Sequence, residues 1–213
     1  LVAIAAGDVQ AARREAHRAV QLLGETPATL NLAAEAARLA GLDDEAERNF
    51  QSLARRHDAA FLGYRGLYRL ATARRDWAEA SQHLSAAERI SPRAGWLRSE
   101  RATLAARTGD WAVAIASADD ATTKAGFAVA GARAATDPRA SAALAKQAFG
   151  FAPGFAPAAV AHASGLRAAG RESAAQSVLR QAWAEAPHPD IAAAALAGAA
   201  TPADRSRIAH ALA

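Results

Sequence analysis

The side chains in this sequence best suited to chemistry are its histidines, and they are scattered. The sequence has no cysteine, which excludes thiolate metal sites, disulfides and cysteine nucleophiles. No histidine pair has the H-E-x-x-H spacing of a helical zinc site. One imidazole is enough to ligate a haem iron, so a haem ligand stays open as an alternative to ordinary surface or interhelix histidines. Only His188, which stands between Pro187 and Pro189, is expected to be fixed in a turn. The six are His17, His57, His83, His162, His188 and His210.

The carboxylates and serines do not form catalytic patterns either. Asp43 and Asp44, like Asp119 and Asp120, are adjacent. Neighbours on a helix point about 100° apart and cannot flank one bond as paired catalytic carboxylates do. There is no G-x-S-x-G nucleophile elbow and no glycine fingerprint for a dinucleotide. We therefore predict that the chain is not an enzyme and has no metal or cofactor site, with haem as the one alternative.

The composition predicts packed helices. Of the 213 residues, 52% are hydrophobic but only 6% are aromatic, and alanine supplies most of the apolar share. Alanine is the best helix former, and the scarcity of β-branched and aromatic residues disfavours strands. The net charge is +4, and basic residues alternate with acidic ones, so no continuous track for a nucleic acid is expected. The sequence predicts an all-α protein that does not bind nucleic acid.

A regular repeat organises the chain. The expected turn residues Gly7, Gly41, Arg75 and Gly109 are equally spaced, 34 positions apart. Each is followed by alanine five positions later and by further expected seam positions at +9 and +12. Gly170 begins another copy, and a degraded copy between them turns at Thr136, which follows Gly109 by only 27 positions. Because this interval is short, we expect the first helix of the degraded copy to have lost about two turns. A helix pair that cannot bury its own apolar face stacks on copies of itself.

Cap chemistry marks the starts of individual helices. Thr26-Pro27, Asp137-Pro138 and Thr201-Pro202 each place an N-cap acceptor before a proline at the first helical position. The last predicted helix, over 203–212, has an apolar edge at Ile208 and Leu212. It is expected to cap the end of the array.

The units resemble the tetratricopeptide repeat (TPR). The resemblance is carried by the dipeptides Asp76-Trp77 and Asp110-Trp111, the alanine that follows each, and the prolines Pro92, Pro153 and Pro187, each 17 positions after its turn residue. It implies a single domain over 1–213, a right-handed TPR solenoid of antiparallel helix pairs with a C-terminal capping helix. The expected units are 1–24, 27–58, 61–92, 95–121, 122–153 (degenerate) and 156–187, with the cap at 190–213.

A narrower resemblance points to the proteobacterial HemY family. It is carried by the segment 61–68 (FLGYRGLY), by Ile90-Ser91-Pro92 followed by Trp96, by the segment 30–41 (LNLAAEAARLAG), and by His188-Pro189-Asp190. It implies a TPR domain, of which this chain, without an initial methionine, would be a soluble fragment. An upstream pair of membrane helices would anchor the full-length protein in the inner membrane, with the TPR domain in the cytoplasm. The implied role is linked to haem biosynthesis.

In TPR proteins the first helix of each unit lines a concave groove, and the resemblance carries those positions onto this chain. Their charged members are five arginines and two glutamates, an excess of +3. The groove is therefore expected to bind a protein or peptide segment, and an acidic one would suit it through charge-assisted hydrogen bonds. The alternative is that these are solvated polar faces. The expected groove residues are Asn31, Glu35, Arg38, Arg65, Gly66, Arg69, Trp96, Ser99, Glu100, Arg107 and Arg167, with Leu62, Val160 and Ser164 beside them.

Two glycines inside one expected first helix call for a reason, because each costs about 0.5 to 1 kcal/mol relative to alanine. We expect Gly63 to lie on the seam between helices and Gly66 to face the groove.

Together these patterns predict a non-catalytic scaffold of HemY type that organises late haem-biosynthesis proteins. A haem or porphyrin carrier or sensor, and a TPR adaptor in cell-envelope assembly, are the alternatives, since one fold hosts many functions. A clamp of the chaperone type for a C-terminal carboxylate is not expected, because the groove positions hold only Asn31 and no lysine.

Overall fold

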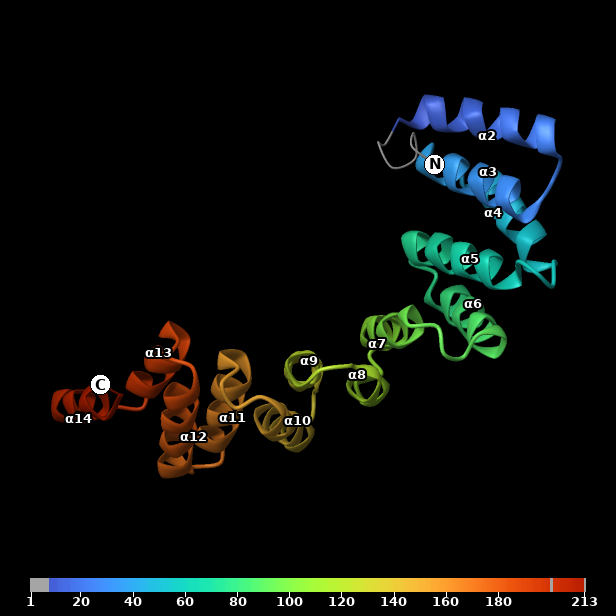
Figure 1. The fold of residues 1–213 in the computed structure, drawn as a ribbon. Helices are drawn as coiled ribbons and strands as arrows, with labels where there is room; N and C mark the ends of the chain where they lie inside the picture. Colours follow the sequence, from blue (N-terminus) through green and yellow to red (C-terminus); the bar gives the residue numbers. More distant parts are fainter. Residues whose placement is uncertain (1–7, 200, 213) are drawn as a thin grey trace. The chain divides into compact units, whose positions relative to one another are not determined.

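The computed structural model describes residues 8–199 and 201–212, and within these residues it contains helices and no strand (Figure 1). The helices follow one another with short connections. Their bounds are α2 (Val9–Leu23), α3 (Pro27–Leu39), α4 (Asp43–Ala54), α5 (Ala60–Arg74), α6 (Trp77–Ile90), α7 (Trp96–Thr108), α8 (Trp111–Ser117), α9 (Ala121–Ala134), α10 (Pro138–Phe151), α11 (Ala156–Ala168), α12 (Glu172–Glu185), α13 (Pro189–Ala197) and α14 (Pro202–Leu212).

The chain divides into two compact units, residues 1–97 and 98–213. In unit 1, each helix from α2 to α6 packs on the next, and α3 also contacts α5. In unit 2, each helix from α8 to α14 packs on the next, and α9 contacts α11, which contacts α13. First helices of successive pairs therefore touch, as expected for stacked helix pairs. The all-α fold of antiparallel TPR-type pairs is confirmed, whereas the single domain over 1–213 stays a prediction.

The turns between paired helices lie where the regular repeat places them. Gly41, Arg75, Gly109 and Gly170 have φ of 70°, 60°, 81° and 71°, the left-handed region that glycine adopts at least cost. Arg75 is the one non-glycine residue in this region among those described. The predicted turn at Thr136 falls between α9 and α10, and the one at Gly7 lies outside the described residues.

The predicted N-caps are confirmed. The Thr26 hydroxyl accepts from the Thr29 amide at 3.2 Å, and the Asp137 carboxylate accepts from the amides of the first turn of α10 at 3.1 and 3.2 Å. The Thr201 hydroxyl accepts from the Asp204 amide at 3.1 Å, while the Asp204 carboxylate accepts from Thr201. Each cap satisfies amides that have no partner within the helix.

The seam between helices is built largely from alanine, as predicted. The small methyl groups let neighbouring helices approach closely, and a few large side chains fill the remaining space. Phe50, Leu53 and Leu179 are among the largest side chains that are fully buried. The predicted seam positions found buried are Ala12, Ala16, Ala46, Phe50, Leu53, Ala80, Leu84, Ala87, Ala114, Ala118, Ala145, Ala148, Ala175, Leu179 and Ala182.

The position of the shortened helix differs from the prediction. We expected the first helix of the degraded copy to be short, but α9 has 14 residues and the preceding second helix, α8, has 7. The chain leaves the helix at Ala118, where ψ is 143°. The Asp120 carboxylate then starts α9 by accepting from the Thr123 amide at 2.8 Å and its hydroxyl at 2.7 Å. Ala121, predicted on the seam, is consequently the exposed first residue of α9.

The last helix closes the array of unit 2, as predicted. Ile208 and Leu212 of α14 pack, partly buried, against the core cluster formed by α11, α12 and α13. The indole nitrogen of Trp183 donates to the Leu212 carbonyl at 2.5 Å. Within the part of the chain that the structure describes, no helix is both long and apolar enough to cross a bilayer.

Candidate protein-binding face

Glu35 links two first helices in unit 1. Its carboxylate accepts from Arg38 Nε at 2.9 Å within α3 and from Arg69 Nη1 at 2.8 Å across to α5. Glu35 and Arg69 are 34 residues apart, so they occupy the same position in successive helix-pair repeats. Because first helices of neighbouring pairs lie side by side, equivalent positions meet. The three predicted groove residues therefore form one ionic cluster.

Aromatic rings form a platform beside this cluster. The Trp96 ring lies 5.7 Å from Phe61 and 5.9 Å from Tyr68, centroid to centroid. The Arg65 guanidinium lies over Trp96 at 5.4 Å from the ring centroid, within the range of a cation–π interaction. Leu62, one turn before Arg65, is 40% exposed.

We call the surface formed by Glu35, Arg38, Leu62, Arg65, Arg69 and Trp96 the first-helix face. It carries three guanidinium groups and one carboxylate, so its formal charge is +2. Arginine offers several N–H donors in a planar fork that suits carboxylates. Beside them stand one exposed aliphatic side chain and a half-buried indole. This combination suits a protein segment that presents acidic and apolar side chains together.

Gly66 is not part of this face, contrary to the prediction. It is buried, and a Cβ there would lie 2.2 Å from Cδ1 of the Phe50 ring. Phe50, from α4, fills the space on that side of α5. Gly63 lies on the seam, as predicted, since its Cβ would lie 2.3 Å from the Ala54 amide nitrogen. Both glycines therefore serve the close approach of α4 and α5.

The other predicted groove residues are distributed over both units. Asn31 is half-buried on α3, in unit 1. On the α7 part of unit 2, Ser99 and Arg107 are exposed and Glu100 is half-buried. Arg167 is bound to Glu172 within unit 2, by Nε at 3.0 Å. That ion pair, and a further hydrogen bond from Gln176, hold the pKa of Glu172 below its ordinary value. Partner binding at all these residues stays a prediction.

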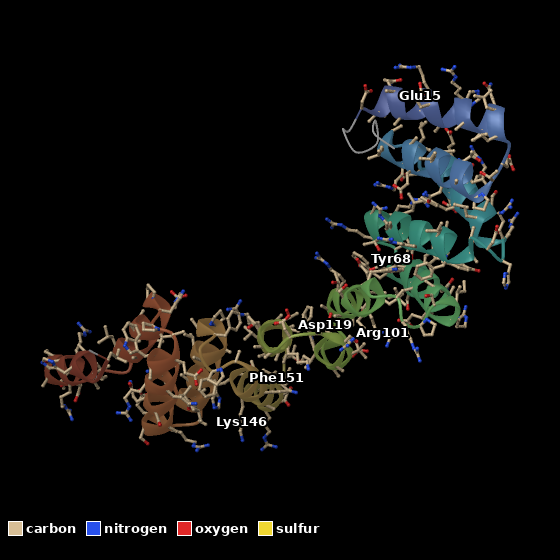
Figure 2. All side chains as sticks on the ribbon, viewed as in Figure 1. Glu15, Tyr68, Arg101, Asp119, Lys146 and Phe151 are labelled. Carbon is tan, nitrogen blue, oxygen red and sulfur yellow. The ribbon has the colours of Figure 1, made fainter. Side chains whose placement is uncertain are left out.

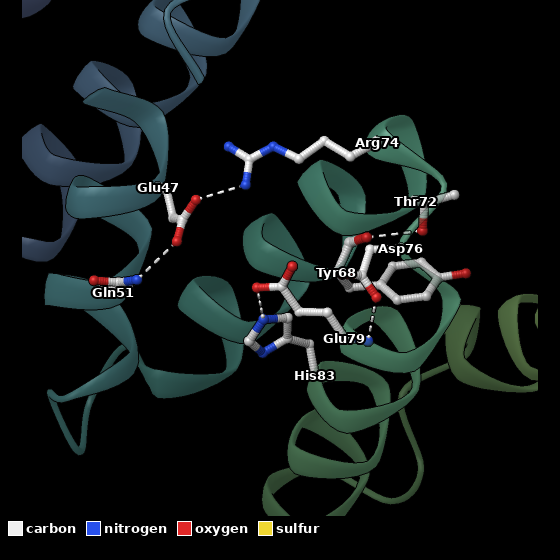
Figure 3. A network of polar contacts seen from close by, with 8 residues as sticks. All are labelled: Glu47, Gln51, Tyr68, Thr72, Arg74, Asp76, Glu79 and His83. Atoms are coloured by element: carbon white, nitrogen blue, oxygen red, sulfur yellow. Dashed lines mark hydrogen bonds and ion pairs between the residues drawn. The ribbon is translucent and has the colours of Figure 1, made fainter. Parts of the chain in front are cut away.

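A second ionic network joins α4 to α5 in unit 1 (Figure 3). Arg74 Nη1 donates to the Glu47 carboxylate at 2.7 Å, and Gln51 donates to the same group at 3.0 Å. The Glu47 hydrogen bond raises the pKa of Arg74 above its ordinary value. This network resembles the one around Glu35 in its chemistry, but it lies outside the first-helix face.

Unit 2 has a groove of 880 Å³ between α9, α10 and α11. Val160 and Ser164, predicted to face a groove, do line it. Two arginines that sequence reasoning missed, Arg133 and Arg139, also line it, with small side chains between them.

Nitrogen- and oxygen-bearing side chains project from helices along the described chain rather than gathering on one helix (Figure 2).

Two of the histidines, His188 and His162, make contacts that fix their place in the fold. His188 is fixed in a turn, as predicted, and its Nδ1 accepts from the Asp190 amide at 3.1 Å at the start of α13. His162 lies against Phe149, with ring centroids 5.6 Å apart. Among residues 8–199 and 201–212, no three His, Asp or Glu side chains gather in a way that could hold a metal ion.

His162 predicts a pH dependence of stability in unit 2. Burial, with smaller contributions from Lys146 and Arg171, lowers the pKa of His162 from its ordinary value of 6.5. The unfolded chain then binds this proton more readily than the folded one, so stability is full above pH ~6.5 and falls as the pH drops through the folded pKa. Since the ring is only partly buried, the loss should be about 1 kcal/mol at most.

Thermal unfolding of wild type and His162→Gln at pH 7.5 and pH 5 measures this loss. The variant should show a smaller difference between the two pH values than wild type. His17→Gln, at an exposed position, is the control and should behave as wild type. An unchanged pH difference in His162→Gln would contradict the prediction.

No family model matches the sequence, and no curated protein is similar to it. Among solved structures, the chain is similar to the TPR2AB domain of yeast Sti1 in its complex with pHSP90. The two share 15% identity, the alignment covers 99% of this chain and 94% of that chain, and the TM-score is 0.38. A likeness of this degree assigns no partner to this chain. The helix-pair fold is established by the geometry of each unit.

Sequence reasoning found the charged residues of the first-helix face but missed their arrangement. Phe61 and Tyr68, which hold Trp96, were not predicted as parts of the site. The pairing of Glu35 with Arg69 was also missed, although the 34-residue separation of these opposite charges was a usable signal.

Proposed function

We propose that this chain is a non-catalytic interaction scaffold that binds an acidic protein segment at the first-helix face of unit 1. The observation that carries the proposal is the convergence of Arg38, Arg65 and Arg69 beside exposed Leu62. Charged groups at an interface favour complementary partners and disfavour like-charged ones. A partner with carboxylates and an apolar side chain fits this surface.

We further propose a HemY-like role, in which the bound proteins belong to the late steps of haem biosynthesis at the inner membrane. The support is the resemblance of residues 30–41 and 61–96 to that family. Residues 61–96 include Arg65, Arg69 and Trp96, so the segment that carries the resemblance also supplies much of the face. An envelope-assembly adaptor would use the same surface with another partner.

A haem carrier is less favoured. The described residues that line the groove of unit 2 include no histidine, and His188 uses its Nδ1 to cap α13. A haem titration of the purified chain tests this alternative directly, because a bound haem would shift its Soret absorption.

Reversing the charge of the face tests the proposal. Arg65→Glu with Arg69→Glu turns two favourable contacts into repulsive ones, and places a new carboxylate beside Glu35. The expected loss of affinity is about 2 to 5 kcal/mol, or about 30-fold to several thousandfold. The fold should survive, since exposed charges contribute little to stability. The measurement is co-purification of late haem-biosynthesis enzymes from membranes of the source cell, quantified at several salt concentrations.

The matched control reverses the same amount of charge on second helices of unit 1. Arg48 on α4 and Arg89 on α6 are both exposed, and their double replacement by glutamate should leave capture unchanged. Equal loss from both double variants would indicate diffuse electrostatics, and no loss from either would move the binding site off the face. Capture of other proteins with the same dependence on Arg65 and Arg69 would support the scaffold and contradict its haem assignment.

A further inference from the structure

Glu35 is the one carboxylate of the first-helix face, and it occupies the arginines that an acidic partner needs. It accepts from Arg38 Nε at 2.9 Å and from Arg69 Nη1 at 2.8 Å. Hydrogen bonds between ionised groups are the strong ones in proteins. Any acidic segment that binds here must therefore compete with a carboxylate that is already in place.

We propose that Glu35 is an internal stand-in for a partner's carboxylate, and that the face selects a segment in which an acidic residue lies next to an apolar one. The incoming carboxylate replaces Glu35 at Arg38 and Arg69, while the apolar side chain lies against Leu62 and Trp96. This inference rests on the proposed function and adds to it both the chemistry of the partner and the residue that limits its affinity.

The exposures allow this exchange. The side chain of Arg69 is 45% exposed and that of Arg38 is 28% exposed, whereas that of Glu35 is 19% exposed. Part of each arginine side chain is thus open to solvent, more so than the carboxylate that pairs with it. A second carboxylate can therefore reach these arginines from solvent and compete with Glu35.

The spacing of Arg65 and Arg69 on α5 determines how far apart the acidic and apolar side chains of the partner segment must be. Arg65 and Arg69 are one turn apart on α5, and side chains so placed stand roughly 5 to 6 Å apart. Arg65 is held over Trp96, so the apolar part of the face begins one turn from Arg69, where the partner's carboxylate would bind. An extended peptide covers this distance with about two residues, which places the acidic and apolar side chains close together in its sequence.

Replacing Glu35 tests the inference, because removing a competitor should strengthen binding. The probe is the synthetic peptide GEELFEELG, and its neutral analogue GQQLFQQLG reports any binding that needs no carboxylate. In calorimetric titrations at low salt, Glu35→Gln should bind the acidic peptide about tenfold more tightly than wild type. Its affinity for the neutral analogue should not change. Unchanged or weaker binding of the acidic peptide would overturn the inference.

Glu47→Gln is the matched control. Glu47 also accepts from an arginine of α5, at 2.7 Å from Arg74 Nη1, and it lies outside the face. Its replacement makes the same change of charge and should leave the affinity for the acidic peptide unchanged. Tenfold strengthening by this variant as well would show that net charge alone is responsible, and would overturn the assignment to Glu35.

A second variant covers the case in which Glu35→Gln fails to fold, as judged by circular dichroism. Glu35→Asp keeps the charge but is shorter by one methylene, so it cannot reach both guanidinium groups as Glu35 does. It should bind the acidic peptide more tightly than wild type, by less than tenfold, and equal affinity would count against the inference. Should Arg65→Glu with Arg69→Glu weaken partner capture while Glu35→Gln leaves peptide affinity unchanged, the proposed function stands and this inference alone fails.

Discussion

Replacing Leu84 by aspartate is expected to destabilise unit 1 by about 3 to 5 kcal/mol. Leu84 is 4% exposed and lies on the seam face of α6. A carboxylate there loses its hydration without gaining a partner, and such buried charges are among the few single changes with effects of this size. Urea unfolding measures the loss, and Gln82→Asp, at an exposed position on the same helix, should cost much less.

The location of the damage is as informative as its size. Helices in this array contact only near neighbours, so hydrogen exchange in Leu84→Asp should rise first in α5 and α6. A uniform rise along unit 1, or none, would contradict the assignment of Leu84 to the seam.

Replacing Gly63 by alanine is expected to cost about 3 kcal/mol. The new Cβ would lie 2.3 Å from the Ala54 nitrogen and 2.6 Å from the Phe50 carbonyl oxygen. These are backbone atoms, so no change of rotamer relieves the overlap and α4 must move away from α5. Gly66→Ala should also destabilise, but its neighbour is the Phe50 ring, and Phe50→Leu should restore part of the loss.

Gly126→Ala in α9 is the control. Gly126 also lies inside a helix, but its Cβ would meet nothing within 4 Å. Alanine should therefore stabilise the protein, by about 0.5 to 1 kcal/mol, through its higher helix propensity. Thermal unfolding compares the two variants, and an increase in stability with Gly63→Ala would show that α4 and α5 are not in close contact.

The sequence alone predicted well the features that recur in each helix pair, which are the turn residues and the seam alanines. Gly41, Gly109 and Gly170 mark turns because a left-handed residue is needed at each, and the seam alanines recur at fixed distances from them. Thr26 and Asp137 start helices by hydrogen bonds that are local in sequence. Such signals need no knowledge of the partner helix, and the structure confirms them.

The failures concern choices that spacing does not decide. The short interval from Gly109 to Thr136 shows that about two turns are lost, but not which helix loses them. The decisive signal was Asp120 followed by Thr123, which caps α9 early. Gly66 was misplaced because the ring that covers it, from Phe50, belongs to the preceding helix pair. The aromatic support of Trp96 by Phe61 and Tyr68 likewise depends on contacts between successive helix pairs of unit 1.

The ion pair between Glu35 and Arg69 makes the order of the repeats matter. Repeat arrays are often treated as modules that can be exchanged, duplicated or replaced by a consensus unit. Here the two charges belong to different helix-pair repeats of unit 1 and meet because those repeats are adjacent. Changing the order of the repeats would leave each helix pair intact and still separate the Glu35 carboxylate from the Arg69 guanidinium. An engineered version of this chain therefore has to keep these two neighbouring repeats together and in this order.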